Sequence, residues 1–202
     1  MRFNVRTLGT VTLTSSPLML VEWILAFTGH LPGGEFGPAD AVIGLVYLCG
    51  FLAAIVALKK LQITGNRGWA AIFFYFQVCL LLMAAQQQVL EMFRTDAHPK
   101  LFAIADAAWP LSHISMCGTG VAVLVARRWR GYRAILPFLC GLAVPALIAV
   151  QAFAGKEAGH VAFAVLVTAG FGLLGHAVRS GSDAPSGQKV TYASRAQSIS
   201  RS

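Results

Sequence analysis

Long apolar runs separated by short polar segments dominate the hydrophobic pattern of this chain. Six runs can be drawn, covering residues 11–29, 39–58, 69–93, 101–126, 134–154 and 158–178. Each has about 20 residues or more, which is enough for an α-helix to cross the roughly 30 Å hydrocarbon core of a bilayer. The alternating segments of about ten residues that are typical of membrane β-barrels do not occur. We therefore predict an all-α, polytopic membrane protein with a bundle of six transmembrane helices.

The first run is the weakest of the six. Hydroxyl residues and Pro17 precede its apolar core, and Glu22 interrupts that core. Because Arg2 and Arg6 come before it, a secretory signal peptide has to be considered. The glutamate and the lack of an A-x-A site argue against cleavage, so we expect a retained first helix.

Lysine and arginine residues collect on one side of this topology. Cytoplasmic loops retain these residues, whereas translocated loops do not. Only Arg94, Lys100 and Lys156 fall on the far side from the N-terminus. We therefore expect both termini in the cytoplasm and the protein in the cell (inner) membrane. Thirteen of the sixteen basic residues share the N-terminal side: Arg2, Arg6, Lys59, Lys60, Arg67, Arg127, Arg128, Arg130, Arg133, Arg179, Lys189, Arg195 and Arg201.

The composition also indicates that lipid is the main solvent. Hydrophobic residues make up 56% of the chain and charged residues 12%, whereas soluble domains have about 25% charged residues. A net charge of +8 would favour nucleic acid as the partner of a soluble protein. Here the basic residues flank membrane spans, so we expect the lipid bilayer as partner, with anionic headgroups at the cytoplasmic face, and no nucleic acid.

Short connections between the runs predict one antiparallel six-helix domain over residues 1–179. Residues 180–202 are polar, Ser-rich and weakly basic, which predicts a disordered cytoplasmic tail. The four cysteines all lie within apolar runs and form no CxxC pair, so no disulfide framework is expected.

Three carboxylates are expected in the outer half of the membrane. With a helical rise of about 1.5 Å per residue, Glu22 lies about 12 Å from the outer end of its span, Asp106 about 9 Å and Glu91 about 5 Å. No Lys or Arg lies in the interior of a predicted span. Ionisable groups in hydrocarbon usually face the bundle interior or a wet cavity. Desolvation without a cation keeps a carboxyl group protonated, which suits a general acid.

The fourth run has the richest polar pattern. Asp106, Pro110, His113 and Cys117 follow one another at intervals of four, three and four residues, which places them on one helix face. Pro110 cannot donate to the helix and crowds the carbonyl of Asp106, so a kink is expected there. Neighbouring serines or water would provide hydrogen bonds for the freed carbonyl.

Polar residues of the third run share a face in the same way, and two such faces on antiparallel neighbours can meet. We therefore predict a carboxylate, imidazole and amide site in the outer half of the bundle. The predicted catalytic residues are Asp106, Glu22 and His113, and the predicted substrate-binding residues are Glu91, Gln88, Gln77 and Trp109.

Each of these residues also has a purely structural interpretation. Glu22, in its protonated form, could hydrogen-bond another helix, and Asp106 could stabilise the fourth helix. His113 could be a satisfied interior imidazole, and the glutamines could form interhelical hydrogen bonds. His113 and Cys117 have the spacing of metal ligands, but two ligands are too few. We therefore expect no metal and no other cofactor.

Three classes of function follow from this pattern. The first is acid–base chemistry on, or binding of, a small lipophilic molecule. The second is a proton- or cation-coupled carrier, which with six helices per chain would favour a homo-oligomer. The third is a non-catalytic membrane subunit or assembly factor. A site requires the polar residues to converge on one cavity, and a carrier also requires a polar route to the cytoplasmic side. The inner halves of the spans are nearly all apolar, which favours the first class over the carrier.

Overall fold

The computed structural model describes residues 4–32, 37–65, 68–93 and 99–181, and every regular element in these ranges is a helix. The predicted tail, apart from its first two residues, lies outside the described residues, as do Arg94 and parts of three loops. The helices are α1 (Val5–Ser15), α2 (Leu18–Phe27), α3 (Pro38–Lys60), α4 (Gly68–Met92), α5 (Pro99–Ala126), α6 (Tyr132–Gly141), α7 (Ala143–Ala154) and α8 (Lys156–Gly181).

These helices provide five to six segments that can cross a membrane. By length and hydropathy, α3, α4, α5, α8 and the α1–α2 pair each qualify, and α6 with α7 makes a sixth if this pair, which is bent by 57°, is one span. Each of the six apolar runs lies largely within one of these helices or helix pairs. The all-helical class is therefore confirmed for the described part of the chain, and its long apolar helices are compatible with a membrane bundle.

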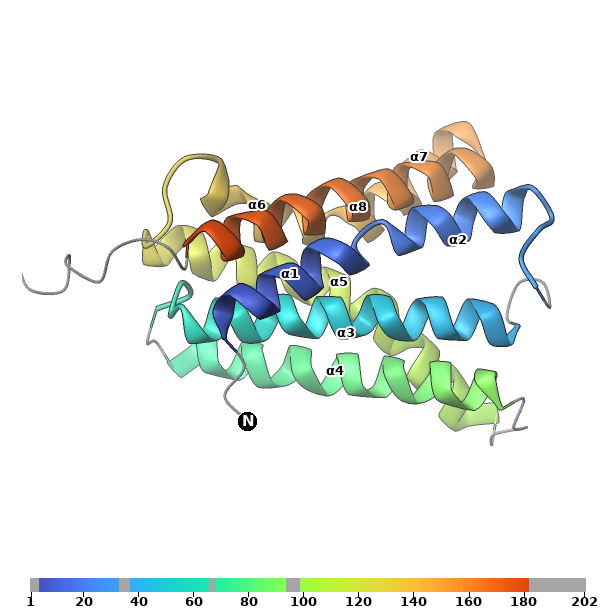
Figure 1. Cartoon of the computed structure of the whole chain (residues 1–202), viewed down its shortest axis with the longest axis horizontal. Coiled ribbons are helices and arrows are strands. Elements are labelled where there is room, and N and C mark those ends of the chain that lie inside the picture. The colour runs from blue at the N-terminus through green and yellow to red at the C-terminus, as the bar shows by residue number, and fades with distance from the viewer. Residues whose placement is uncertain (1–3, 33–36, 66–67, 94–98, 182–202) are drawn as a thin grey trace, which may run out of the picture.

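The spans form a closed bundle in chain order. Each span packs against the next, and α8 returns to pack against α1 and α2, while α3 also contacts α8 across the middle. The first described helix begins, and the last one ends, at the same end of the bundle (Figure 1). We call this the basic end, because α3 finishes there with Lys59 and Lys60 and α8 with Arg179. The opposite end is called the acidic end, because α3 begins there with Asp40 and α8 with Glu157.

Large apolar side chains lie on both the inside and the outside of the bundle. Tyr47 and Phe51 are 1% exposed in the core, whereas Ile72 is 70% exposed and Phe153 is 92% exposed. Soluble monomers rarely expose apolar surface continuously along several helices. The outer surface therefore fits a hydrocarbon environment.

The first span begins earlier than predicted and is broken. Its helix starts at Val5 rather than at residue 11, because the Asn4 side chain caps it by accepting from the Arg6 N–H. Pro17 cannot donate to the carbonyl of Leu13, and the Ser16 hydroxyl donates to that carbonyl instead, at 2.9 Å. The polar residues that lower the hydrophobicity of the first run thus also stabilise the break between α1 and α2.

The fifth run, predicted as one span over 134–154, is divided at Leu142. Pro145 has no N–H for the carbonyl of Gly141, and the N–H of Leu142 is shared between the carbonyls of Phe138 and Leu139. A tightened turn of this kind, followed by a missing hydrogen bond, accounts for the 57° bend.

Pro110, where a kink is predicted, lies within α5, which continues as helix from Pro99 to Ala126. The hydroxyls of Ser112 and Ser115 do bond carbonyls of their own helix, but these are the carbonyls of Trp109 and Ser112 rather than that of Asp106. A proline alone therefore does not decide where a span breaks.

Candidate functional site

Two carboxylates of neighbouring helices share one amide at the acidic end. The Gln87 Nε2 donates to Glu91 Oε1 at 2.9 Å on the same helix and to Asp106 Oδ1 at 3.1 Å on α5. Gln87 is buried, Glu91 is half-buried and Asp106 is exposed. The carboxylate of Asp40 at the start of α3 is also close enough to Glu91 to act on it electrostatically. We call Gln87, Glu91 and Asp106 the acid–amide cluster.

The predicted binding residue Gln88 faces a different helix. Its amide lies against Gly44 of α3, where an added Cβ would come within 2.6 Å of Gln88 Oε1. The absence of a side chain at Gly44 thus lets the amide of Gln88 approach the α3 backbone. The contact joins α4 to α3 rather than contributing to the acid–amide cluster.

His113 is surrounded by aromatic rings in the core of the bundle. Its Nε2 is 2.8 Å from the Tyr47 hydroxyl, and its Nδ1 is 3.1 Å from the carbonyl of Trp109. A carbonyl only accepts, so Nδ1 carries the proton and Nε2 accepts from Tyr47. Both ring nitrogens of this fully buried imidazole are therefore satisfied. The surrounding rings are Tyr47, Phe51, Trp109, Phe163 and Phe171.

Gln77 of α4 connects this helix to α5 in the interior of the bundle. Its Nε2 donates to the Ser112 carbonyl at 3.2 Å and lies 3.4 Å from Met116 Sδ, while its Oε1 accepts from the Thr119 hydroxyl at 2.8 Å. The side chain is fully buried. This is the geometry of interhelical hydrogen bonding, with no side left open to a ligand.

Glu22 lies apart from the other predicted catalytic residues. It is on α2, which packs against α3 and α8, and α3 runs between α2 and α4 (Figure 1). Asp106 is exposed on the surface of the bundle, whereas His113 is fully buried among aromatic rings. The structure therefore brings Asp106 and Glu91 together through Gln87, but it does not gather Asp106, Glu22 and His113 in one cavity.

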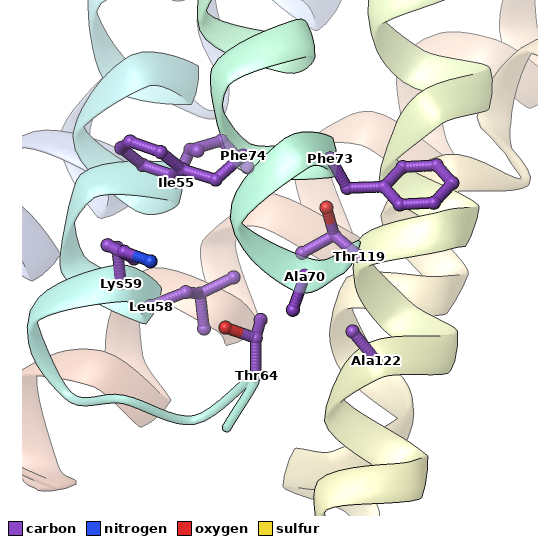
Figure 2. Close-up of a pocket in the computed structure, with 9 residues that line it drawn as sticks. All are labelled: Ile55, Leu58, Lys59, Thr64, Ala70, Phe73, Phe74, Thr119 and Ala122. Carbon is purple, nitrogen blue, oxygen red and sulfur yellow. The ribbon is translucent and has the colours of Figure 1, made fainter. Parts of the chain in front are cut away.

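A pocket lies at the basic end of the bundle. Figure 2 shows it between the end of α3, the start of α4 and the last turns of α5. Its interior has room for about one water molecule. Lys59 lines it, with Nζ 5.5 Å from the centre of the Phe74 ring. The other lining residues are Ile55, Leu58, Thr64, Ala70, Phe73, Thr119 and Ala122.

Several residues of the cluster, the aromatic surroundings of His113 and the pocket were not predicted from the sequence. Gln87 could have been found, because it stands four residues before Glu91, a spacing at which helix side chains meet. Tyr47 could also have been found, since a phenol within an apolar span needs a hydrogen-bond partner. Thr64 and Thr119 carry no comparable signal.

No protein-family model, no curated protein and no solved structure matches this chain. The interpretation of the site therefore depends on its geometry alone.

Proposed function

We propose that this membrane protein binds a small lipophilic molecule through the acid–amide cluster near the acidic end. The observation that supports this is the shared amide: one Gln87 NH₂ group serves carboxylates from two helices. A single neutral donor leaves most acceptor sites of Glu91 and Asp106 available. An ammonium or another donor-rich polar group is the chemistry that two adjacent carboxylates would recognise.

Among the described side chains, the charge around the acid–amide cluster is negative, which supports a cationic or donor-rich ligand; the side chains of Arg94 and Lys100 lie outside the described residues. The basic side chains that the structure describes lie at the basic end, except Lys156, which starts α8. That helix packs against α7, α6 and α1 rather than against α4. Asp106 is exposed and would exchange protons with a ligand in any acid–base chemistry, whereas the enclosed His113 and Gln77 would hold α3, α4 and α5 in place.

A test uses octylammonium as the probe and octanol as its uncharged counterpart. In nonionic detergent, octylammonium should raise the melting temperature of the full-length protein more than octanol does. The Asp106→Asn variant should lose this difference, because the amide has no charge to offer the ammonium group. Glu157→Gln, a matched change at an exposed carboxylate of the same end, should keep it. Equal responses of the two variants would refute a ligand site at the acid–amide cluster.

The polar contacts between α4 and α5 also favour a second candidate, a proton- or cation-coupled carrier. Thr119 bonds Gln77 on one side and lines the pocket at the basic end on the other. Between Gln77 and Gln87, however, the interface is closed by buried Leu81 and Ala84. A carrier would have to open this apolar segment. Proton flux into vesicles that depends on Asp106 would support the carrier, and binding without flux would support the first proposal.

A further inference from the structure

The pocket at the basic end continues into a second, wider pocket. Thr64 and Ala122 line both, and the second adds about 470 Å³ of space that is partly open to solvent. We call the two together the basic-end pocket. The residues that line only the wider part are Gly65, Trp69, Val125, Ala126 and Arg128.

The charge lining this pocket is positive. Lys59 lines the inner part and Arg128 the outer part. The carboxylates that the structure describes lie on other segments, towards the acidic end or on α2: Glu22, Asp40, Glu91, Asp106 and Glu157. The 25-residue α4 also begins at this pocket, and a helix N-terminus favours negative charge. The electrostatics therefore select an anion.

The outer rim has an uncommon backbone conformation. Gln62 and Arg127, which follow α3 and α5, both have a φ of 53°, a left-handed conformation that side-chain-bearing residues seldom adopt. The Arg128 Nη1 donates to Gln62 Oε1 at 3.3 Å across the two segments. A left-handed residue commonly ends a helix, and after α3 the Ile63 N–H bonds the Leu58 carbonyl at 3.1 Å to close this end. This backbone conformation places the Arg128 guanidinium beside the α3–α4 connection.

Apolar side chains lie next to the charged ones. Ile55, Leu58 and Phe74 form the inner wall, and Phe73, which is 37% exposed, extends from α4 towards α5, where its ring lies close to Gly118 (Figure 2). An anion without a hydrophobic part would gain nothing from these side chains. A ligand with an alkyl chain could place its charge at the rim and run the chain along α4.

We propose that the basic-end pocket binds the phosphate group of an anionic amphiphile, a phospholipid headgroup from the leaflet at that end. Lys59 and Arg128 bind the phosphate, and the hydroxyl of Thr64 donates a further hydrogen bond. The alkyl chain lies against Phe73. This site is separate from the acid–amide cluster and does not depend on it.

The test measures the lipid that the full-length protein retains when it is released from nanodiscs into a mass spectrometer. Phosphatidylglycerol should be retained in preference to phosphatidylcholine with the same acyl chains. Lys59→Gln and Arg128→Gln should each reduce retained phosphatidylglycerol about fivefold, the effect expected for one basic residue at an anionic headgroup. Arg130→Gln is the matched control, because Arg130 is exposed on the same turn but does not line the pocket.

Three results would overturn the proposal. Loss of lipid from Arg130→Gln equal to that from Arg128→Gln would show that general surface charge is responsible. Equal retention of the two lipids would remove the anion site. Displacement of phosphatidylglycerol by inorganic phosphate at the same concentration as by a short-chain phosphatidylglycerol would show that the alkyl chain contributes nothing and that the pocket takes free phosphate. Helical content and melting temperature of each variant establish that the fold is retained.

Discussion

Two pairs of buried polar side chains join different helices of this bundle. Tyr47 bonds His113 between α3 and α5, and Thr119 bonds Gln77 between α5 and α4. Among the described side chains, no buried nitrogen or oxygen atom lacks a hydrogen-bond partner. In hydrocarbon an unpaired group is costly, so these pairs specify which helix faces meet.

Tyr47→Phe tests the contribution of the Tyr47–His113 hydrogen bond by removing one hydroxyl group. The change keeps the ring but leaves His113 Nε2 without a donor, so we expect a loss of about 1 kcal/mol of unfolding free energy. The melting temperature in detergent should fall by about 2–4 °C for a chain of this size. Tyr75→Phe is the control, because Tyr75 is 63% exposed on α4. Equal changes in both variants would contradict a role for the buried bond.

At the scale of elements, Ser16 and Thr168 stabilise the break between α1 and α2. The Ser16 hydroxyl bonds the Leu13 carbonyl that Pro17 leaves free, and Thr168 of α8 donates to the Ser16 carbonyl at 3.2 Å. Ser16→Ala should therefore cost about 1 kcal/mol in unfolding free energy when Pro17 is present.

Pro17→Ala provides the matched background for this prediction. In that background the helix can supply its own backbone N–H to the Leu13 carbonyl, so Ser16→Ala should then cost much less. Chemical unfolding of the four proteins of this double-mutant cycle measures the difference. The same cost in both backgrounds would mean that Ser16 acts through something other than the proline break.

The sequence predicted the long apolar helices well, because long apolar runs are a direct consequence of lipid as solvent. It did not predict the breaks, because the outcome of a proline depends on its neighbours. Pro110 lies inside an uninterrupted α5, whereas the chain bends just before Pro145.

The candidate site was predicted only in part, because the sequence gives the depth of a residue in its span but not the contacts between helices. Depth along a span follows from residue number, and it placed Asp106 and Glu91 near one end. Which helix faces meet depends on side-chain packing, which the sequence does not give. In the structure His113 and Glu22 lie apart from Asp106 and Glu91.

At the scale of the whole molecule, the bundle has opposite charge at its two ends. Helices α3, α5 and α8 end in or just before Lys and Arg residues at the basic end, and acidic residues lie near the starts of α3, α5 and α8 at the acidic end. Since cytoplasmic segments retain Lys and Arg, we expect the basic end, with the start of α1 and the end of α8, to face the cytoplasm.

Introduced cysteines test this orientation in intact cells. Glu157→Cys, at the exposed start of α8, should react with a membrane-impermeant maleimide added from outside. Arg130→Cys, exposed between α5 and α6, should react only after the membrane is permeabilised. The unaltered chain is the control, because its own Cys49 and Cys79 lie within spans, where a water-soluble reagent has poor access. The reverse pattern would place the basic end outside. The amphiphile of the basic-end pocket would then come from the outer leaflet, and the ligand of the acid–amide cluster from the cytoplasmic side.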